Sequence, residues 1–139
     1  IFGGDGGVAV KVLQVREVPL PEPTENQVLV KVRSAALNFP DILLIAGKYQ
    51  FKPPLPFTPG LEVAGPIEKV GSAVEGLKLG QRVLAQMPMG GFAEYGVAEA
   101  GAVQTIPDSM TDDEAAILGR LEELELESRV LRDAYLRVH

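Results

Sequence analysis

The sequence predicts a mainly β domain, a small barrel or sandwich with short helices, followed by an amphipathic helix at the C-terminal end. The 139 residues contain several short apolar segments separated by turn residues, which is typical of such folds. The 15 glycines and 11 prolines are spread along the chain, and this indicates many turns rather than disorder. A hydrophobic fraction of 46% is enough for one packed core.

The first two expected strands lie in the N-terminal third of the chain. Residues 8–18, VAVKVLQVREV, alternate apolar and polar side chains with the two-residue period of a half-buried strand. A connector with three prolines follows and cannot continue regular structure. Residues 28–36, VLVKVRSAA, are the second expected strand, with Val28, Val30 and Val32 on one face.

A short helix and further strands are expected next. Residues 41–47, DILLIAG, predict one or two helical turns, with Asp41 as the N-cap and Gly47 as the stop. The Pro-rich residues 48–60 are expected to form a loop. LEVAGPIEKVG predicts a strand in which Pro66 requires an edge or a bulge. QRVLAQM, GFAEYGVAEA and AVQTIP predict three more short strands.

The C-terminal part of the sequence changes to a helical period. Thr111 and Glu114 form a capping-box pattern in front of EAAIL. Residues 120–139 predict one amphipathic helix, so we place a domain at 1–118 and a helical tail at 119–139. The apolar seam of this helix would expose a stripe to water unless it packs on its own domain or on a second chain. A homodimer would use the apolar residues of the seam, namely Leu121, Leu124, Leu131, Tyr135 and Val138.

Charge and composition exclude several classes of function. A net charge of −6 without any run of Lys or Arg argues against a nucleic-acid surface. The chain has no cysteine, so it has no disulfide and no thiolate metal site, and we expect a cytoplasmic protein. No apolar run approaches the roughly 18 residues that span a bilayer, and the first residues lack the basic region of a signal peptide.

Asn38 and Tyr49 are the main site candidates. The amide of Asn38 offers a donor and an acceptor just after a strand, although such a residue more often satisfies backbone groups in a turn. The phenol of Tyr49 can donate a hydrogen bond to a carbonyl oxygen that becomes an enolate. The ordinary alternative is a loop tyrosine half buried against Phe51. Taken alone, the residues favour the ordinary alternative in both cases.

Three other polar residues are weaker candidates. Asp41 is expected to cap a helix rather than to act as an acid. Glu62 could orient a neighbouring side chain, or it could pair with Arg or Lys on an adjacent strand. His139 ends the sequence, and we expect no catalytic role for it. The glycines of GGDGG precede no helix, and no G-x-G-x-x-G or Walker-type motif is present, so the sequence lacks a pyrophosphate site.

Residues 18–118 resemble the N-terminal, GroES-like domain of the medium-chain dehydrogenase/reductase superfamily, and most closely its zinc-free quinone oxidoreductase branch. The resemblance is carried by VPLPEP, VLVKV, ALNFPDILLIAGKYQFKPPLPFTPGLEVAG, VGSAVEGLKLGQRV, GGFAEY and IPDSMTDDEAAIL. Several ordered motifs over this length are far more specific than any one of them. The resemblance implies an irregular β-barrel.

The resemblance also implies a reaction, namely hydride transfer from NADPH to a quinone or an α,β-unsaturated carbonyl compound. The site would lie in the cleft between this domain and a Rossmann domain. In similar reductases, the residue that matches Asn38 contacts the nicotinamide end of the cofactor, and the residue that matches Tyr49 lies near the substrate carbonyl. Zinc-dependent relatives have a Cys where the LNFPD segment runs and a His where Leu61 stands here, so we expect no metal.

The sequence departs from the family pattern after EAAIL, because GRLEELELESRVLRDAYLRVH does not match it. The Rossmann domain is absent from these residues. We therefore expect the substrate-side domain of a quinone or enone reductase, inactive alone and without tight NADPH binding. The alternative is a non-enzymatic GroES-like module that self-associates through its C-terminal helix. A co-chaperonin is a weaker third option, since a shared fold does not imply a shared function.

Overall fold

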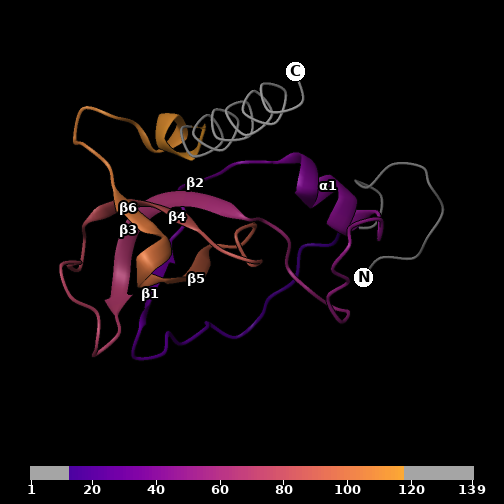
Figure 1. Ribbon diagram of the computed structural model, residues 1–139, viewed down its shortest axis with the longest axis horizontal. Helices are drawn as coiled ribbons and strands as arrows, with labels where there is room; N and C mark the ends of the chain where they lie inside the picture. Colours follow the sequence, from indigo (N-terminus) through magenta and orange to yellow (C-terminus); the bar gives the residue numbers. More distant parts are fainter. Residues whose placement is uncertain (1–12, 118–139) are drawn as a thin grey trace, which may run out of the picture.

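Residues 13–117 are described by the computed structural model, and within them the strands form one antiparallel sheet. The order along the sheet is β5-β1-β3-β4-β6, and β2 pairs with β3 beside this path (Figure 1). The strands are β1 Gln27–Lys31, β2 Ser34–Ala35, β3 Glu62–Val70, β4 Arg82–Gln86, β5 Tyr95–Glu99 and β6 Val103–Thr105. The helical elements are α1 Phe39–Ile45, the 3-10 turn η2 Ala100–Ala102 and a helix over residues 112–117.

The sheet is not closed into a barrel. Along the described residues, β5 pairs only with β1, and β6 pairs only with β4. Closure needs a hydrogen-bonded link between these two end strands, so the mainly β fold is confirmed, but the expected irregular β-barrel is an open sheet over the described residues. The strand expected over residues 8–18 is wrong where it is described, since residues 13–18 are exposed and form no strand.

The second expected strand is divided in two because the chain changes neighbours. β1 pairs with β5 as far as Lys31, and the N–H of Val32 still donates to the carbonyl of Glu94 at 2.8 Å. One residue later, the N–H of Arg33 donates to the carbonyl of Ala64 on β3, at 3.0 Å. β2 then continues along β3. The run of apolar residues predicts the existence of a strand but not this change of neighbour.

β3 is the central strand, and Pro66 sits where its neighbour changes. On one side β3 pairs with β4, and on the other it pairs first with β2 and then with β1. The N–H of Ile67 donates to the carbonyl of Gln81 on the β4 side. Successive N–H groups of a strand point to opposite sides, so the backbone nitrogen of Pro66 points to the junction between β2 and β1. The missing N–H of proline therefore costs no hydrogen bond of the sheet there. Just before it, a Cβ on Gly65 would collide with the carbonyl oxygen of Lys31.

The expectation of an edge or a bulge at Pro66 is confirmed only in part. The register between β1 and β3 shifts between Leu29 and Val30, which leaves Glu68 as the extra residue of a bulge. β3 itself is not an edge strand. The three later strands that the sequence predicts are confirmed as β4, β5 and β6.

Two apolar clusters hold the sheet and the helix at 112–117 together. The larger cluster consists of Val28, Val30, Val63, Ile67, Val83, Ala85, Met87 and Ala98. The smaller one joins β3 and β4 to this helix through Ala64, Leu84, Ile106, Ala115 and Ala116. Arg82 also fastens the helix, because its Nη2 donates to Oδ1 of Asp112 at 2.9 Å and to the carbonyl of Met110 at 2.6 Å.

The N-terminus of the same helix carries the expected capping box. The N–H of Thr111 donates to Oε2 of Glu114 at 2.8 Å, and the N–H of Glu114 donates to Oγ1 of Thr111 at 3.2 Å. The prediction from the sequence is confirmed. The helix expected over residues 120–139 and the boundary at 118 lie outside the described residues. Between residues 13 and 117, no helix is long and apolar enough to cross a membrane.

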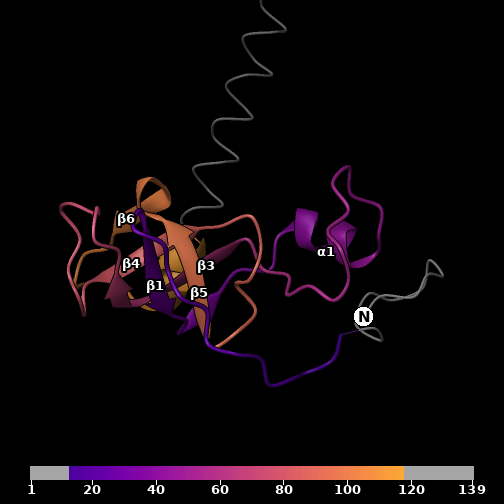
Figure 2. The same ribbon diagram turned by 90° about the horizontal axis from the view of Figure 1, so that it is seen from below.

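Residues 37–61 form what we call the α1 lobe, which consists of α1 and the irregular segments on either side of it. The lobe stands to one side of the sheet in two perpendicular views (Figures 1 and 2). The Pro-rich residues 48–60 contain no helix or strand, as expected. The candidate site lies where this lobe meets the sheet.

Candidate functional site

Asn38 is the N-cap of α1, and the expectation that Asp41 would occupy this place is wrong. The backbone of Asn38 is extended, with φ −103° and ψ 160°, and the helix begins at Phe39. Pro40 lies in the first helical turn, where its missing N–H needs no partner. Asp41 is therefore the third helical residue, and its Oδ2 accepts the N–H of Asn38 at 2.9 Å. Gly47, with φ +65°, follows the end of the helix as expected.

Asp41 joins the α1 lobe to the start of β3. Its side chain is fully buried, and its Oδ1 accepts the N–H of Gly60 at 3.1 Å. Burial raises the pKa of Asp41, and the hydrogen bonds from the N–H groups of Asn38 and Gly60 offset part of that rise. One carboxylate thus fixes both the first turn of α1 and the loop that enters β3.

Gly60 lies in that loop because the backbone there is tightly packed. Its φ is +101°, and a Cβ would collide with the main-chain nitrogen of Phe92. The carbonyl of Gly60 accepts the N–H of Gly91 at 2.9 Å. The loop before β3 and the loop before β5 therefore interlock through their main chains, and this gives the N–H bonded to Asp41 a fixed position.

Glu62, the first residue of β3, holds the side chain of Asn38. Nδ2 of Asn38 donates to Oε2 of Glu62 at 3.2 Å. Asn38 is 8% exposed and Glu62 is 3% exposed, so the contact is shielded from water. This contact is the kind that the interpretation of Glu62 as a residue that orients a neighbour requires, and the orienting role itself stays a prediction.

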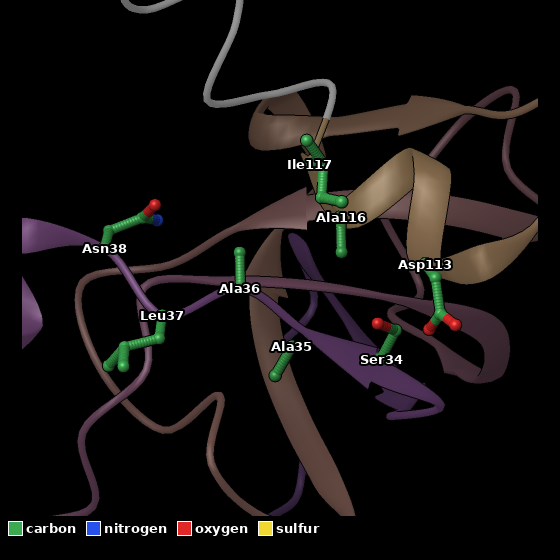
Figure 3. A pocket seen from close by; sticks show the side chains of 8 residues that line it. All are labelled: Ser34, Ala35, Ala36, Leu37, Asn38, Asp113, Ala116 and Ile117. Carbon is green, nitrogen blue, oxygen red and sulfur yellow. The ribbon is translucent and has the colours of Figure 1, made fainter.

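A groove runs between the segment that leads into α1 and the helix at 112–117. Its volume is about 460 Å³, and Figure 3 shows its two walls. Ala116 and Ile117 face Ala36 across it, and Asn38 extends its amide from the end where the α1 lobe begins. The lining residues are Ser34, Ala35, Ala36, Leu37, Asn38, Asp113, Ala116 and Ile117. The groove is mostly apolar, with few polar side chains that could orient a ligand.

Tyr49 does not line this groove. It is half-buried after the C-terminal end of α1, and its N–H donates to the carbonyl of Leu43 at 3.2 Å. A helix as long as α1 spans about 10 Å, so Asn38 and Tyr49 lie beyond opposite ends of this helix, about that far apart. Phe51, the expected packing partner of Tyr49, is 56% exposed. The structure does not bring the two candidate residues into one cavity.

His139 lies outside the described residues. Within residues 13–117, no group of three or more His, Cys, Asp or Glu side chains is placed to hold a metal ion. The absence of a metal site remains a prediction, carried by Leu61 and the lack of cysteine. The sequence did not point to Ser34 or Asp113 as part of the groove, because they are distant in the chain and belong to no motif.

The chain is similar to known proteins of one family. The family model "Alcohol dehydrogenase GroES-like domain" matches residues 24–108. The quinone oxidoreductase of Sus scrofa is 40% identical over 115 residues, which make up 82% of this chain and 35% of that protein. The chain thus spans about a third of the length of the curated relatives it matches.

Solved structures of similar proteins share the fold. The Escherichia coli quinone oxidoreductase, complexed with NADPH, matches with a TM-score of 0.75 and 33% identity, over 83% of this chain and 35% of that one. The human synaptic vesicle membrane protein VAT-1 homolog-like protein matches with a TM-score of 0.76 and 33% identity, over 83% and 36%. The chain therefore belongs to the GroES-like domain family of the medium-chain dehydrogenase/reductases, in its quinone oxidoreductase branch.

Proposed function

We propose that these residues form the substrate-side part of an NADPH-dependent reductase of quinones or enones. The observation that carries the proposal is the amide of Asn38, which is buried, held by Glu62 and placed at one end of the groove. A mostly apolar cavity with a few fixed polar groups is the usual form of a small-molecule site. The relatives whose names include quinone oxidoreductase, and the structure solved with NADPH, support this choice of reaction.

The residues present fit one end of NADPH better than the whole cofactor. A groove of about 460 Å³ is within the range of ligand sites, but it is smaller than a pocket for a complete dinucleotide. The 139 residues contain no G-x-G-x-x-G motif and so offer no cradle for the pyrophosphate. When bound, NADPH supplies the hydride.

In this proposal Asn38 orients the carboxamide of the nicotinamide ring. Tyr49 donates a hydrogen bond from its phenol to the substrate carbonyl oxygen, which gains negative charge as the β-carbon is reduced. The two residues lie at opposite ends of α1, so the ring and the carbonyl would have to occupy different positions along this helix. The half-buried position of Tyr49 allows such a contact at the edge of the lobe.

Calorimetry tests the cofactor side of the proposal on the 139-residue chain. We expect no binding of NADPH at micromolar affinity, because the pyrophosphate has no site. Heat of binding that fits a micromolar or tighter constant would contradict this expectation.

A chimera tests the reaction itself. Residues 24–108 would replace the matching segment of the Escherichia coli quinone oxidoreductase, and NADPH oxidation with 1,4-benzoquinone would be followed. We expect activity in the chimera, and a loss of about a hundredfold in kcat for Tyr49→Phe, because the carbonyl oxygen loses its proton donor. Tyr95→Phe, another half-buried tyrosine in β5, is the matched control. Equal activities of the two variants would remove Tyr49 from the proposal.

The second candidate function is a non-enzymatic module that associates with itself. Large apolar side chains are exposed at the groove, with Leu37 64% exposed and Ile117 59% exposed, and this favours association. Sedimentation over a range of protein concentrations separates the candidates. A strict monomer would exclude self-association.

A further inference from the structure

The amide of Asn38 has two chemically different ends. Its oxygen accepts hydrogen bonds, and its nitrogen donates them. A half-turn of the amide exchanges the two ends in nearly the same volume. The group that Asn38 presents to the groove therefore depends on what fixes the orientation of its amide.

Glu62 is placed to fix that orientation. Its Oε2 lies 3.2 Å from Nδ2 of Asn38, and both residues are buried. In this contact the Glu62 oxygen is the acceptor and Nδ2 of Asn38 is the donor, so Glu62 holds the nitrogen end of the amide and not the oxygen end. In a site shielded from water, the preference between the two orientations is stronger than at the surface.

Hydrogen bonds of their main chains hold Asn38 and Glu62 in place, independently of the contact between their side chains. The N–H of Asn38 donates to the carboxylate of Asp41 at 2.9 Å, which fixes the start of α1. The carbonyl of Glu62 accepts the N–H of Ala36 at 3.1 Å, which fixes the start of β3 against the chain that leads to Asn38. The contact between Asn38 and Glu62 is therefore built by two separate elements and does not depend on a mobile surface side chain.

We propose that Glu62 is the positioning residue of Asn38: its carboxylate keeps the amide nitrogen turned inward and leaves the carbonyl oxygen as the end that meets a ligand. This inference rests on the proposed function, because it names the hydrogen-bond polarity of the same site. The ligand group that fits a carbonyl oxygen is a donor, such as the NH₂ of the nicotinamide carboxamide. Glu62 itself touches no ligand and acts through Asn38.

Nuclear magnetic resonance of the ¹⁵N-labelled chain tests the positioning without any ligand. The sequence contains asparagine only at positions 26 and 38, and Asn26 is exposed, so it serves as an internal reference. In the unchanged protein, we expect the side-chain NH₂ of Asn38 to exchange with solvent about tenfold or more slowly than that of Asn26, because it is buried and hydrogen-bonded to Glu62. Equal exchange of the two amides would overturn the proposal.

Two substitutions separate positioning from a general effect on the fold. Glu62→Gln keeps the volume but can bond either end of the Asn38 amide, so we expect faster exchange of that NH₂ and shifted signals. The backbone signals of β1 and β4 should stay in place. Glu68→Gln makes the same change at an exposed position of β3 and should leave Asn38 unaffected. Unchanged Asn38 signals in Glu62→Gln would overturn the proposal, and if that variant does not fold, the comparison with Asn26 decides.

A titration with two dinucleotides tests the ligand polarity and separates it from the proposed function. Millimolar NADPH should shift the side-chain signals of Asn38, whereas the reduced 3-acetylpyridine analogue, which has a methyl group in place of the NH₂, should shift them far less. Equal shifts would overturn the donor assignment. If neither dinucleotide shifted Asn38, the cofactor part of the proposed function would fall, while the exchange measurement would still decide the role of Glu62.

Discussion

The sheet and the α1 lobe are held in place by different forces. In β1, Val28, Leu29 and Val30 are all 0% exposed, so the strand is buried on both faces. In the lobe, large apolar side chains such as Phe39, 62% exposed, face solvent, and the first turn of α1 is attached through the buried carboxylate of Asp41. Apolar burial stabilises the sheet, whereas in the lobe the burial of Leu44 and Ile45 is supplemented by the directed hydrogen bonds of Asp41.

This difference has a consequence for the site. Asn38 stands at the junction, with its main chain in the lobe and its side chain bonded to the sheet through Glu62. A change in the sheet should therefore affect the stability of the whole domain, whereas a change at Asp41 should displace the site while the sheet remains folded. Four substitutions test the contrast, from the largest expected effect to the smallest.

Ile67→Ala should cause the largest loss of stability. Ile67 is 1% exposed in the larger apolar cluster, and its truncation leaves a cavity in the sheet. We expect a loss of about 3 kcal/mol in the free energy of unfolding, measured by urea denaturation. Leu79→Ala is the control, because Leu79 is 68% exposed. Similar losses in the two variants would contradict the role of burial in the sheet.

Asp41→Ala should destabilise the α1 lobe more than it destabilises the sheet. It removes the acceptor of the N–H groups of Asn38 and Gly60, and we expect a cost of about 2 kcal/mol. Hydrogen exchange followed by mass spectrometry should show faster exchange in residues 39–47, with β1 still protected. Asp113→Ala removes an exposed carboxylate as a control. Faster exchange in β1 to the same extent would show that the two regions unfold together.

The pH dependence of Asp41 sharpens the same prediction. Burial raises its pKa above the ordinary value of 3.8, so the folded protein holds this proton more tightly than the unfolded chain does. The stability that Asp41 contributes by this route is fully present below pH 3.8 and is lost as the pH rises through the folded pKa. Asn cannot titrate, so the wild type should lose stability relative to Asp41→Asn as the pH rises above 3.8 and through the raised pKa of the folded protein. A constant difference across this range would contradict the raised pKa.

Thr111→Ala should have a smaller effect, confined to the helix at 112–117. It removes the hydroxyl that accepts the N–H of Glu114 at 3.2 Å, and loss of such a cap costs about 1 kcal/mol. Thermal unfolding of the variant measures this cost. Ser109→Ala, an exposed serine outside the helix, is the control. An unchanged midpoint in Thr111→Ala would mean that Arg82 and the apolar contacts of Ala115 and Ala116 hold the helix in place without the cap.

Lys69→Ala should have the smallest effect of the four. Its Nζ lies 2.7 Å from Oε1 of Glu22, but the two side chains are 41% and 71% exposed. Exposed ion pairs contribute less than about 1 kcal/mol, and salt screens them. We expect a change near the error of urea denaturation at physiological salt. A loss as large as that of Asp41→Ala would show that charged surface contacts matter more here than buried polar ones.

Much of the fold follows from local sequence patterns. The alternation in VLVKV and the short apolar runs later in the chain predict strands, and Thr111 with Glu114 predicts a helix start that the structure confirms. The division of residues 28–36 into β1 and β2 could not be predicted, because it depends on which strand accepts the N–H of Arg33. The failure at residues 13–18 has the same cause, since alternation alone does not provide a neighbouring strand.

The candidate site was predictable only in part. Asn38 and Asp41 are both good cap residues, and the order of their roles depends on where the helix starts relative to Pro40. The contact between Asn38 and Glu62 joins residues 24 positions apart, and no local pattern encodes it. The position of Tyr49, away from the groove, likewise depends on how the loop after α1 folds back.

The packing at Gly65 also limits which sequences this domain can have. The carbonyl of Lys31 occupies the space that any side chain at position 65 would need. A library of all amino acids at this position should therefore return glycine alone among folded variants. The next residue, Pro66, lies where β3 changes its neighbour from β2 to β1. Gly65 thus lets the segment from Lys31 to Arg33 pass close to the backbone of β3. A designer who wished to move the α1 lobe would have to rebuild this backbone contact, because a substitution at position 65 cannot preserve it.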